Sequence, residues 1–135
     1  MVLPYVFICM IVDMNKFDDY ILKKRVEYYE IKTVKCRVLL DEEVVFNRHG
    51  LNHLVRKEGH NRTFVGQRRR FELLKYCKLV LENENSKIEY RISMAGDTKA
   101  EFWGITADIE CLRVKVVLRK INEGKLIFLS VMDFK

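Results

Sequence analysis

The spacing of apolar residues changes from helical to extended near Asn83, and this change constrains the fold more than any other feature of the sequence. In residues 67–82 apolar side chains recur every three or four positions, which predicts a helix with a wide buried stripe. After Asn83 short segments alternate apolar and polar residues, as β-strands do. The predicted stripe consists of Phe71, Leu73, Leu74, Cys77, Val80 and Leu81.

Four strands are predicted after the helix, at residues 87–93, 99–106, 111–120 and 125–132. The connections between them are short, which favours an antiparallel meander, and Gly124 in the last one is expected to take a positive φ. In the third strand the Val116-Val117 pair suggests a shift in the alternation. Arg113, Lys115 and Arg119 are then not expected to share one face, and the strand carries a bulge or is covered on both sides.

The first half of the chain predicts two further helices and a hairpin. Residues 17–30 place Phe17, Ile21, Leu22, Val26 and Tyr29 at helical spacing. Residues 33–40 and 43–46 favour a β-hairpin around Asp41-Glu42. Asn47 is expected to cap a helix that buries Leu51, Leu54 and Val55 and ends at Gly59, before a loop with His60 and Arg62. We therefore expect a single α+β domain over residues 1–135, with N-terminal helices packed on a roughly four-stranded antiparallel β-sheet meander.

The apolar run of residues 1–12 is too short to span a bilayer, and no Lys or Arg precedes it. We interpret residues 1–13 as a buried strand or as an N-terminal extension of a protein that begins at Met14. No membrane partner is expected. Cys9, Cys36, Cys77 and Cys111 are widely spaced without a C-x-x-C pair, which favours small buried hydrophobic residues in a reducing cytoplasm.

The excess positive charge lies in one segment. Residues 48–91 hold eleven Lys or Arg and five Glu, so their net charge of +6 equals that of the whole chain. A localised positive charge attracts an anionic partner such as nucleic acid. The phosphate-contacting residues expected from the sequence are Arg56, Lys57, Arg62, Arg68, Arg69, Lys75 and Lys115.

The chemistry open to the chain is limited by the motifs it lacks. The sequence has no G-x-S-x-G, Walker loop, G-x-G-x-x-G or H-E-x-x-H. Imidazole with dense guanidinium and ammonium groups remains, and these groups can cleave RNA through its own 2′-hydroxyl. His49, His53 and Arg56, at i, i+4 and i+7, are expected on one exposed side of their helix, followed by His60. The alternatives are solvated or phosphate-contacting histidines, and a metal site of His49, His53 and His60.

Three further bulky side chains allow two interpretations each. Arg70 is expected to point nearest the core and to pair with a buried carboxylate, or to belong to the exposed basic run of residues 68–70. Phe102 and Trp103 are expected in the core, with base stacking as the alternative for an exposed ring.

Several segments together resemble a known superfamily. They are VVFNRHGLNHLVRK, QRRRFELLKYCKLVLEN, FWGI, LRVKVVLRK and LIFLSVM. The resemblance, from Lys16 to Phe134, is to the barnase–EndoU–colicin–RelE ribonuclease superfamily in its phage- or mobile-element-associated form. It implies helices on a four-stranded antiparallel sheet whose concave face cleaves RNA without a metal. The superfamily's histidine falls on His53, its basic residue on Arg119 or Lys115, and its hydroxyl on Ser130. No glutamate matches the base of barnase, so the acid and the base stay unassigned.

The function expected is that of a metal-independent, cofactor-free endoribonuclease, such as a toxin-type enzyme, whose partners are RNA and a neutralising protein. His53 would transfer a proton, with His49 or His60 as the second imidazole. The phosphate would be stabilised by Arg119, Lys115 and Arg56. The Ser130 hydroxyl would position the phosphate. The first alternative is a non-catalytic RNA- or DNA-binding module that uses residues 48–91. The second is a protein-interaction domain.

Overall fold

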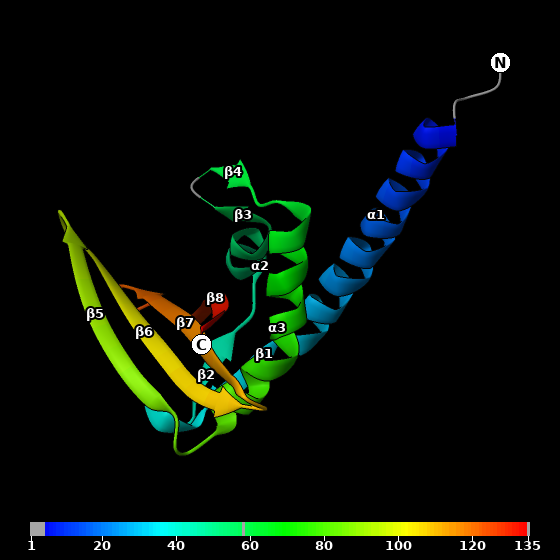
Figure 1. Cartoon of the computed structure of the whole chain (residues 1–135). Helices are drawn as coiled ribbons and strands as arrows, with labels where there is room; N and C mark the ends of the chain where they lie inside the picture. Colours follow the sequence, from blue (N-terminus) through cyan, green and yellow to red (C-terminus); the bar gives the residue numbers. More distant parts are fainter. Residues whose placement is uncertain (1–4, 58, 135) are drawn as a thin grey trace.

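The computed structural model describes residues 5–57 and 59–134. Three α-helices in this part of the chain flank a six-stranded sheet of order β1-β2-β8-β7-β6-β5, and β3 and β4 form a separate two-stranded ribbon (Figure 1). The elements are α1 (Tyr5–Ile31), β1 (Thr33–Cys36), a 3₁₀ turn (Arg37–Leu39), β2 (Glu42–Val45), α2 (Arg48–Val55), β3 (Arg56–Lys57), β4 (His60–Asn61), α3 (Phe64–Glu82), β5 (Lys87–Ala95), β6 (Thr98–Ile109), β7 (Leu112–Ile121) and β8 (Ile127–Phe134).

The α+β class and the antiparallel meander of β5 to β8 are confirmed, but the expected size of the sheet is wrong. The β1–β2 hairpin joins the other edge of β8, where Val45 pairs in parallel with Ile127. The amide of Val45 donates to the carbonyl of Leu126 at 2.9 Å. The sheet is therefore six-stranded and mixed. Its last strand, β8, pairs with β2, which precedes it by more than half the length of the chain.

Helix α3 covers one face of the sheet, as its apolar stripe predicts. All six predicted stripe residues are buried, and they pack with Ile105, Val114, Val116, Leu118 and Phe128 of the strands. Helix α3 begins at Phe64, where the Thr63 hydroxyl accepts from the amide of Gly66 at 3.1 Å. The even-numbered residues of the middle of β7 thus face α3, and its odd-numbered residues face the other way.

The alternation of β7 is unbroken, which corrects two expectations. Arg113, Lys115 and Arg119 do share a face, with the half-buried Val117 between them. The register shift lies in β8: Val117 pairs with Ser130 and Leu118 with Phe128, so Leu129 is the extra residue. Val117 is an apolar residue on the otherwise polar face of β7, and next to Val116 it looks like a break in the alternation of the sequence.

The predicted helix over residues 17–30 is confirmed within α1, but its buried side is rotated from the prediction. Tyr28 is fully buried, with Tyr20 and Ile21 packed against the core, whereas Leu22 and Val26 are exposed. The expected N-terminal strand is wrong from Tyr5 onward, since neither Gly nor Pro interrupts the helix between Tyr5 and Ile31. Residues 1–4 lie outside the described residues. The N-terminal part of α1 projects beyond the rest of the molecule (Figure 1).

The connections follow the sequence in part. The β1–β2 hairpin and the Asn47 cap are confirmed; the Asn47 side chain accepts from the amide of His49 at 3.0 Å. Helix α2 ends at Val55 rather than Gly59, because Arg56 is already extended and leads into the β3–β4 ribbon. The positive φ before β8 falls on Asn122, at 50°, and not on Gly124. Asn122 holds this turn by exchanging hydrogen bonds with Lys99 of β6.

Two of the four cysteines, Cys36 and Cys77, are buried free thiols as expected, and Cys111 is exposed in the β6–β7 turn. The side chain of Cys9 lies outside the described residues. None of the described helices combines the length and the apolar character that crossing a membrane requires.

Candidate functional site

The sheet presents a second face, opposite α3, which we call the far face. Residues that pair directly across neighbouring strands share a face, so the register of β5 to β8 defines it. Five Lys or Arg and two acidic residues give it a net charge of +3 (5 − 2). Its members are Lys87, Glu89, Arg91, Ser93, Ala95, Thr98, Ala100, Phe102, Gly104, Thr106, Asp108, Arg113, Lys115, Val117, Arg119, Ile121, Ile127, Ser130, Met132 and Phe134.

Two of the far-face cations are paired with the two far-face carboxylates. Lys115 lies 3.2 Å from Glu89, and Arg113 lies 3.0 Å from Asp108. Lys115 reaches Glu89 across Gly104, where a Cβ would lie only 2.5 Å from its Cε atom. The absence of a side chain at Gly104 therefore allows Lys115 to extend to Glu89. Because Lys115 is paired with Glu89, it is less available to bind a phosphate than the sequence implied.

Arg119 differs from these residues. It forms no ion pair with any side chain that the structure describes, and its Nε is buried without a hydrogen-bond partner. It lines a hollow of about 220 Å³ with Asn47, His49 and Lys125 among others. Guanidinium, ammonium and imidazole groups thus surround a small space beside the first turn of α2, whose amides also favour negative charge.

Helix α2 holds the histidines at this position because it packs closely on β8. A Cβ at Gly50 would lie 2.4 Å from the Tyr28 hydroxyl and 2.5 Å from the Phe128 carbonyl oxygen, so only glycine allows the approach. The Tyr28 hydroxyl donates to the carbonyl of Asn47 at 2.5 Å. With Leu51 and Leu54 buried, His49 and His53 are exposed on the other side of the helix.

The electrostatic surroundings of His53 link it to the hollow. Partial burial lowers its pKa from the ordinary 6.5, and the positive charges of Arg119, Arg62 and His49 lower it further. The Arg62 Nε also donates to the His53 carbonyl at 3.0 Å. His53 is therefore a mainly neutral imidazole at pH 7, able to accept a proton.

Of the predicted catalytic residues, His49 and Arg119 line the same hollow, whereas His53 does not line it and is linked to it by the charges of Arg119 and His49. Ser130 lies on the far face opposite Val117, one residue pair from Arg119, but its side chain is only 7% exposed. His60 stands apart, exposed in the β3–β4 ribbon. In the same ribbon Arg56 donates to the Gly59 carbonyl at 3.0 Å, and Lys57 is exposed.

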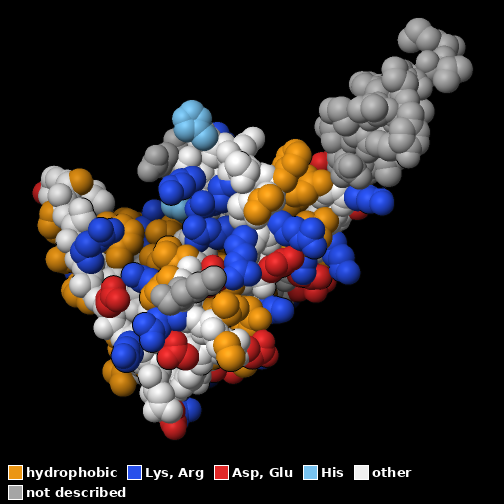
Figure 2. Space-filling model, viewed as in Figure 1, with side chains coloured by type: hydrophobic (Ala, Val, Ile, Leu, Met, Phe, Trp, Pro, Cys, Tyr) orange, Lys and Arg blue, Asp and Glu red, His pale blue; other side chains and the backbone are white. Residues whose placement is uncertain are grey.

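The basic residues of α3 lie away from the hollow. Arg68 pairs with Glu72 at 3.0 Å and lies over the Tyr20 ring, Arg69 pairs with Asp133, and Lys75 lies over the Tyr76 ring. Figure 2 shows Lys and Arg in several groups, interrupted by acidic and hydrophobic side chains. The positive charge of residues 48–91 is therefore one segment in sequence but not one patch in space.

The expectation of a core position is wrong for Phe102 and confirmed for Trp103, and Thr106 was not identified from the sequence. Phe102 lies on the far face, where the Arg91 guanidinium is 4.8 Å from its ring centre, whereas Trp103 points to the α3 side and packs on the core. The Thr106 hydroxyl is buried without a described partner. Strict counting of the alternation in residues 98–109 would have found both far-face residues. Arg70 donates to the Val131 carbonyl, not to a carboxylate as expected.

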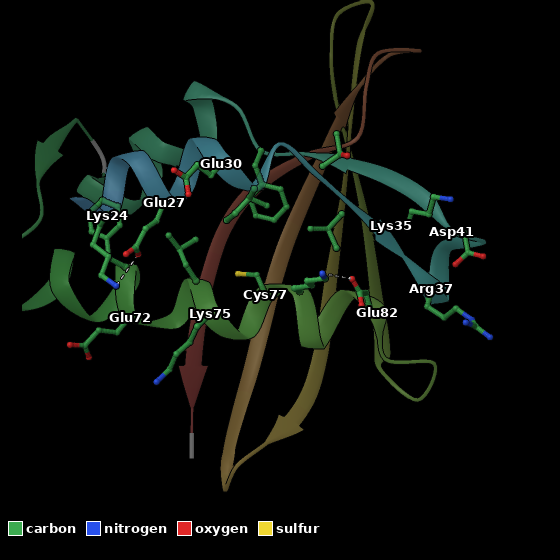
Figure 3. A pocket seen from close by; sticks show the side chains of 17 residues that line it. Lys24, Glu27, Glu30, Lys35, Arg37, Asp41, Glu72, Lys75, Cys77 and Glu82 are labelled. Carbon is green, nitrogen blue, oxygen red and sulfur yellow. Dashed lines mark ion pairs between the residues drawn. The ribbon is translucent and has the colours of Figure 1, made fainter. Parts of the chain in front are cut away.

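A larger hollow, of about 1100 Å³, lies elsewhere, between α1, α3 and β1 (Figure 3). Phe46, Phe71 and Cys77 line its apolar part, and burial raises the pKa of the Cys77 thiol. Charged residues at its margin pair with one another, as Lys24 does with Glu27 at 3.0 Å. None of the described residues that line it is a histidine. Its lining offers no arrangement for proton transfer comparable to the α2 hollow.

Within the described residues no three His, Cys, Asp or Glu side chains are grouped so as to hold a metal ion. Comparison of the chain with protein families, curated proteins and solved structures found no match. The geometry around Arg119 is therefore the basis of the functional argument.

Proposed function

We propose that the protein is an endoribonuclease-like domain in which the hollow beside α2 holds the scissile phosphate of RNA. The observation that carries the proposal is the Arg119 Nε, a buried donor with no described acceptor, in a residue that lines the hollow together with His49. The charge of Arg119 also acts on His53, one turn further along α2. Buried hydrogen-bond donors almost always have an acceptor, so the Arg119 Nε indicates that a ligand supplies one. A phosphate oxygen fits, because guanidinium binds phosphate strongly and in a fixed geometry.

The proposed cleavage step uses the two imidazoles of α2 and the guanidinium of Arg119. Neutral His53 takes the proton of the 2′-hydroxyl, the 2′-oxygen bonds to phosphorus, and the bond from phosphorus to the 5′-oxygen breaks. His49, in its protonated form, gives a proton to the leaving 5′-oxygen. The products are a 2′,3′-cyclic phosphate and a 5′-hydroxyl, so atoms and protons balance. Arg119 stabilises the charge that develops on the phosphoryl oxygens.

Residues around the hollow would hold the rest of the RNA strand. Lys125 lines the hollow itself, and the Arg91–Phe102 pair on the far face offers a cation and a ring on which a base can stack. Arg56, Lys57 and Arg62 of the ribbon region would contact flanking phosphates. Ser130 and Lys115 would act by positioning, since Ser130 is largely buried and Lys115 is paired with Glu89.

The proposal is tested by incubating single-stranded RNA with the purified protein in EDTA. We expect cleavage that leaves 2′,3′-cyclic phosphate ends, and a loss of about 10²- to 10⁴-fold in rate for His53→Ala and for Arg119→Gln. The loss for His49→Ala should exceed that for His60→Ala, because only His49 lines the hollow. Circular dichroism of each variant checks the fold. Intact RNA with the wild-type protein would remove the enzymatic claim.

A non-catalytic RNA- or DNA-binding module is the second candidate. The dispersal of the cations over the far face, the ribbon and α3 favours it, because many weak phosphate contacts suit binding without a focused site. It predicts affinity that falls by about 0.7 to 0.9 log units per log unit of salt for each phosphate neutralised. His53→Ala would then leave binding unchanged, with no cleavage product at any time.

A further inference from the structure

Strand β5 is an uncapped edge of the sheet. It lies at the end of the strand order and pairs only with β6 among the described strands. All nine of its residues are exposed (Figure 1, light green). An exposed edge of this length is a template for pairing with another strand.

The main-chain groups at this free edge follow from the neighbouring strands. Lys99 of β6 exchanges hydrogen bonds with Asn122, so its backbone faces β7 and not β5. Its partner in β5, Met94, must then direct its own N–H and C=O outward, away from β6. By alternation the same holds for Ile92, Tyr90 and Ile88. These residues offer four outward pairs of donor and acceptor.

The side chains of β5 form two stripes of opposite character. The stripe on the α3 side of the sheet is apolar, with Ile88, Tyr90, Ile92 and Met94 exposed by 45%, 54%, 49% and 61%. About half of the surface of each of these side chains is therefore open to solvent. The far-face stripe consists of Lys87, Glu89, Arg91 and Ser93.

This pattern is complementary to itself when the strand is reversed. In an antiparallel pair centred on Tyr90, Ile88 lies opposite the partner's Ile92, and Glu89 lies opposite the partner's Arg91. The outward main-chain groups then meet, because even-numbered residues face even-numbered residues. Registers centred on Glu89 or on Arg91 would place like charges directly opposite, which disfavours them.

We infer that two copies of this chain associate through β5, in antiparallel register centred on Tyr90. The arrangement has two-fold symmetry, joins two six-stranded sheets into one, and places the two apolar stripes side by side on the α3 side of the joined sheet. Each dimer gains two cross-strand Glu89–Arg91 pairs on the far face. The inference does not rest on the proposed ribonuclease activity, although Arg91 takes part in both proposals.

The test is the oligomeric state of the full chain by sedimentation velocity over a range of protein concentrations. The wild-type protein should sediment as a monomer–dimer equilibrium. Glu89→Arg and Arg91→Glu should each weaken the dimer by at least tenfold, since each places like charges opposite. The double variant with both changes should restore it, because the pairs are re-formed with reversed sign. Glu123→Arg, in the exposed β7–β8 turn, changes the net charge as Glu89→Arg does and should have no effect.

A backbone variant completes the design. Ile92→Pro removes an amide that faces outward and has no partner in the monomer, so it should abolish the dimer while circular dichroism stays unchanged. A wild-type protein that is monomeric at every concentration would overturn the inference. So would a dimer that survives both Ile92→Pro and the single charge reversals, since another surface such as α1 would then carry it.

Discussion

At the scale of single residues, the arrangement around Arg119 combines two effects that reinforce each other. The guanidinium is held without a described acid partner, and its charge reaches His53, where it disfavours protonation. An anion entering the hollow would satisfy the donor and remove the repulsion together. The pKa of His53 therefore reports on the occupancy of the hollow.

The residue-scale prediction concerns this pKa. In the wild-type protein His53 should titrate below its ordinary 6.5, and Arg119→Gln should raise the value because one repelling cation is gone. Carbon-bound imidazole protons followed by NMR give the titration directly. Lys75→Gln, which removes a cation from the outer side of α3, should leave the titration unchanged. An unaltered curve in Arg119→Gln would contradict the electrostatic link.

The same shift predicts a pH dependence of stability. The pKa of His53 is lower in the folded protein than in the unfolded chain, so the unfolded chain binds the proton more tightly. As the pH falls through 6.5, the unfolded chain takes up this proton more readily than the folded protein does. His53 therefore costs the folded state stability below about that pH and has no such effect above it. Urea unfolding at several pH values should show a smaller acid-side loss in Arg119→Gln than in the wild-type protein.

At the scale of elements, the contact of α2 with β8 determines where the histidines stand. Gly50→Ala should cost about 1–3 kcal/mol or more, because the new methyl group would overlap the Tyr28 hydroxyl and the Phe128 carbonyl. Chemical denaturation measures the loss. Asn52→Ala on the exposed side of the same helix should change stability by no more than about 0.5 kcal/mol. Equal effects of the two changes would contradict the close packing of α2.

Elements with strong local patterns could be predicted from the sequence, and elements that depend on distant partners could not. Helix α3 and strands β5 to β8 follow from periodicity, and the Asn47 cap follows from residue chemistry. The pairing of β2 with β8 is different, because it rests on the single register pair Val45–Ile127 between segments far apart in the chain. No local pattern encodes such a meeting.

The candidate site shows the same division. His49 and His53 could be predicted as a pair from helical spacing, but Lys125 and the unpartnered Arg119 Nε emerge only when α2, β7 and the turn before β8 meet. Arg68 and Arg69 do not belong to the site, because the position of a charged residue in the sequence does not show which way its side chain points in the fold. Each found a nearby carboxylate on or beside α3 instead.

At the scale of the whole molecule, the prediction concerns the N-terminal part of α1. The described core residues of this helix begin at Tyr20, and the Phe17 ring packs on Phe64 of α3 with ring centres 4.3 Å apart. The N-terminal part of the helix projects beyond the body (Figure 1). Deletion of residues 1–13 should therefore leave a folded protein whose unfolding free energy changes by no more than about 0.5 kcal/mol. Chemical denaturation and the yield of soluble protein give the comparison. Loss of solubility or of a cooperative transition would contradict it.

The position of β8 between β2 and β7 sets the order in which the molecule can be completed. A ribosome releases β8 after every other described element, yet this strand occupies an interior place in the sheet. The edge of β2 that pairs with β8 therefore stays unpaired until β8 inserts between β2 and β7 and joins the β1–β2 hairpin to the rest of the sheet. Because that closure spans most of the chain, it requires a large loss of chain entropy, and folding should be governed by this late insertion.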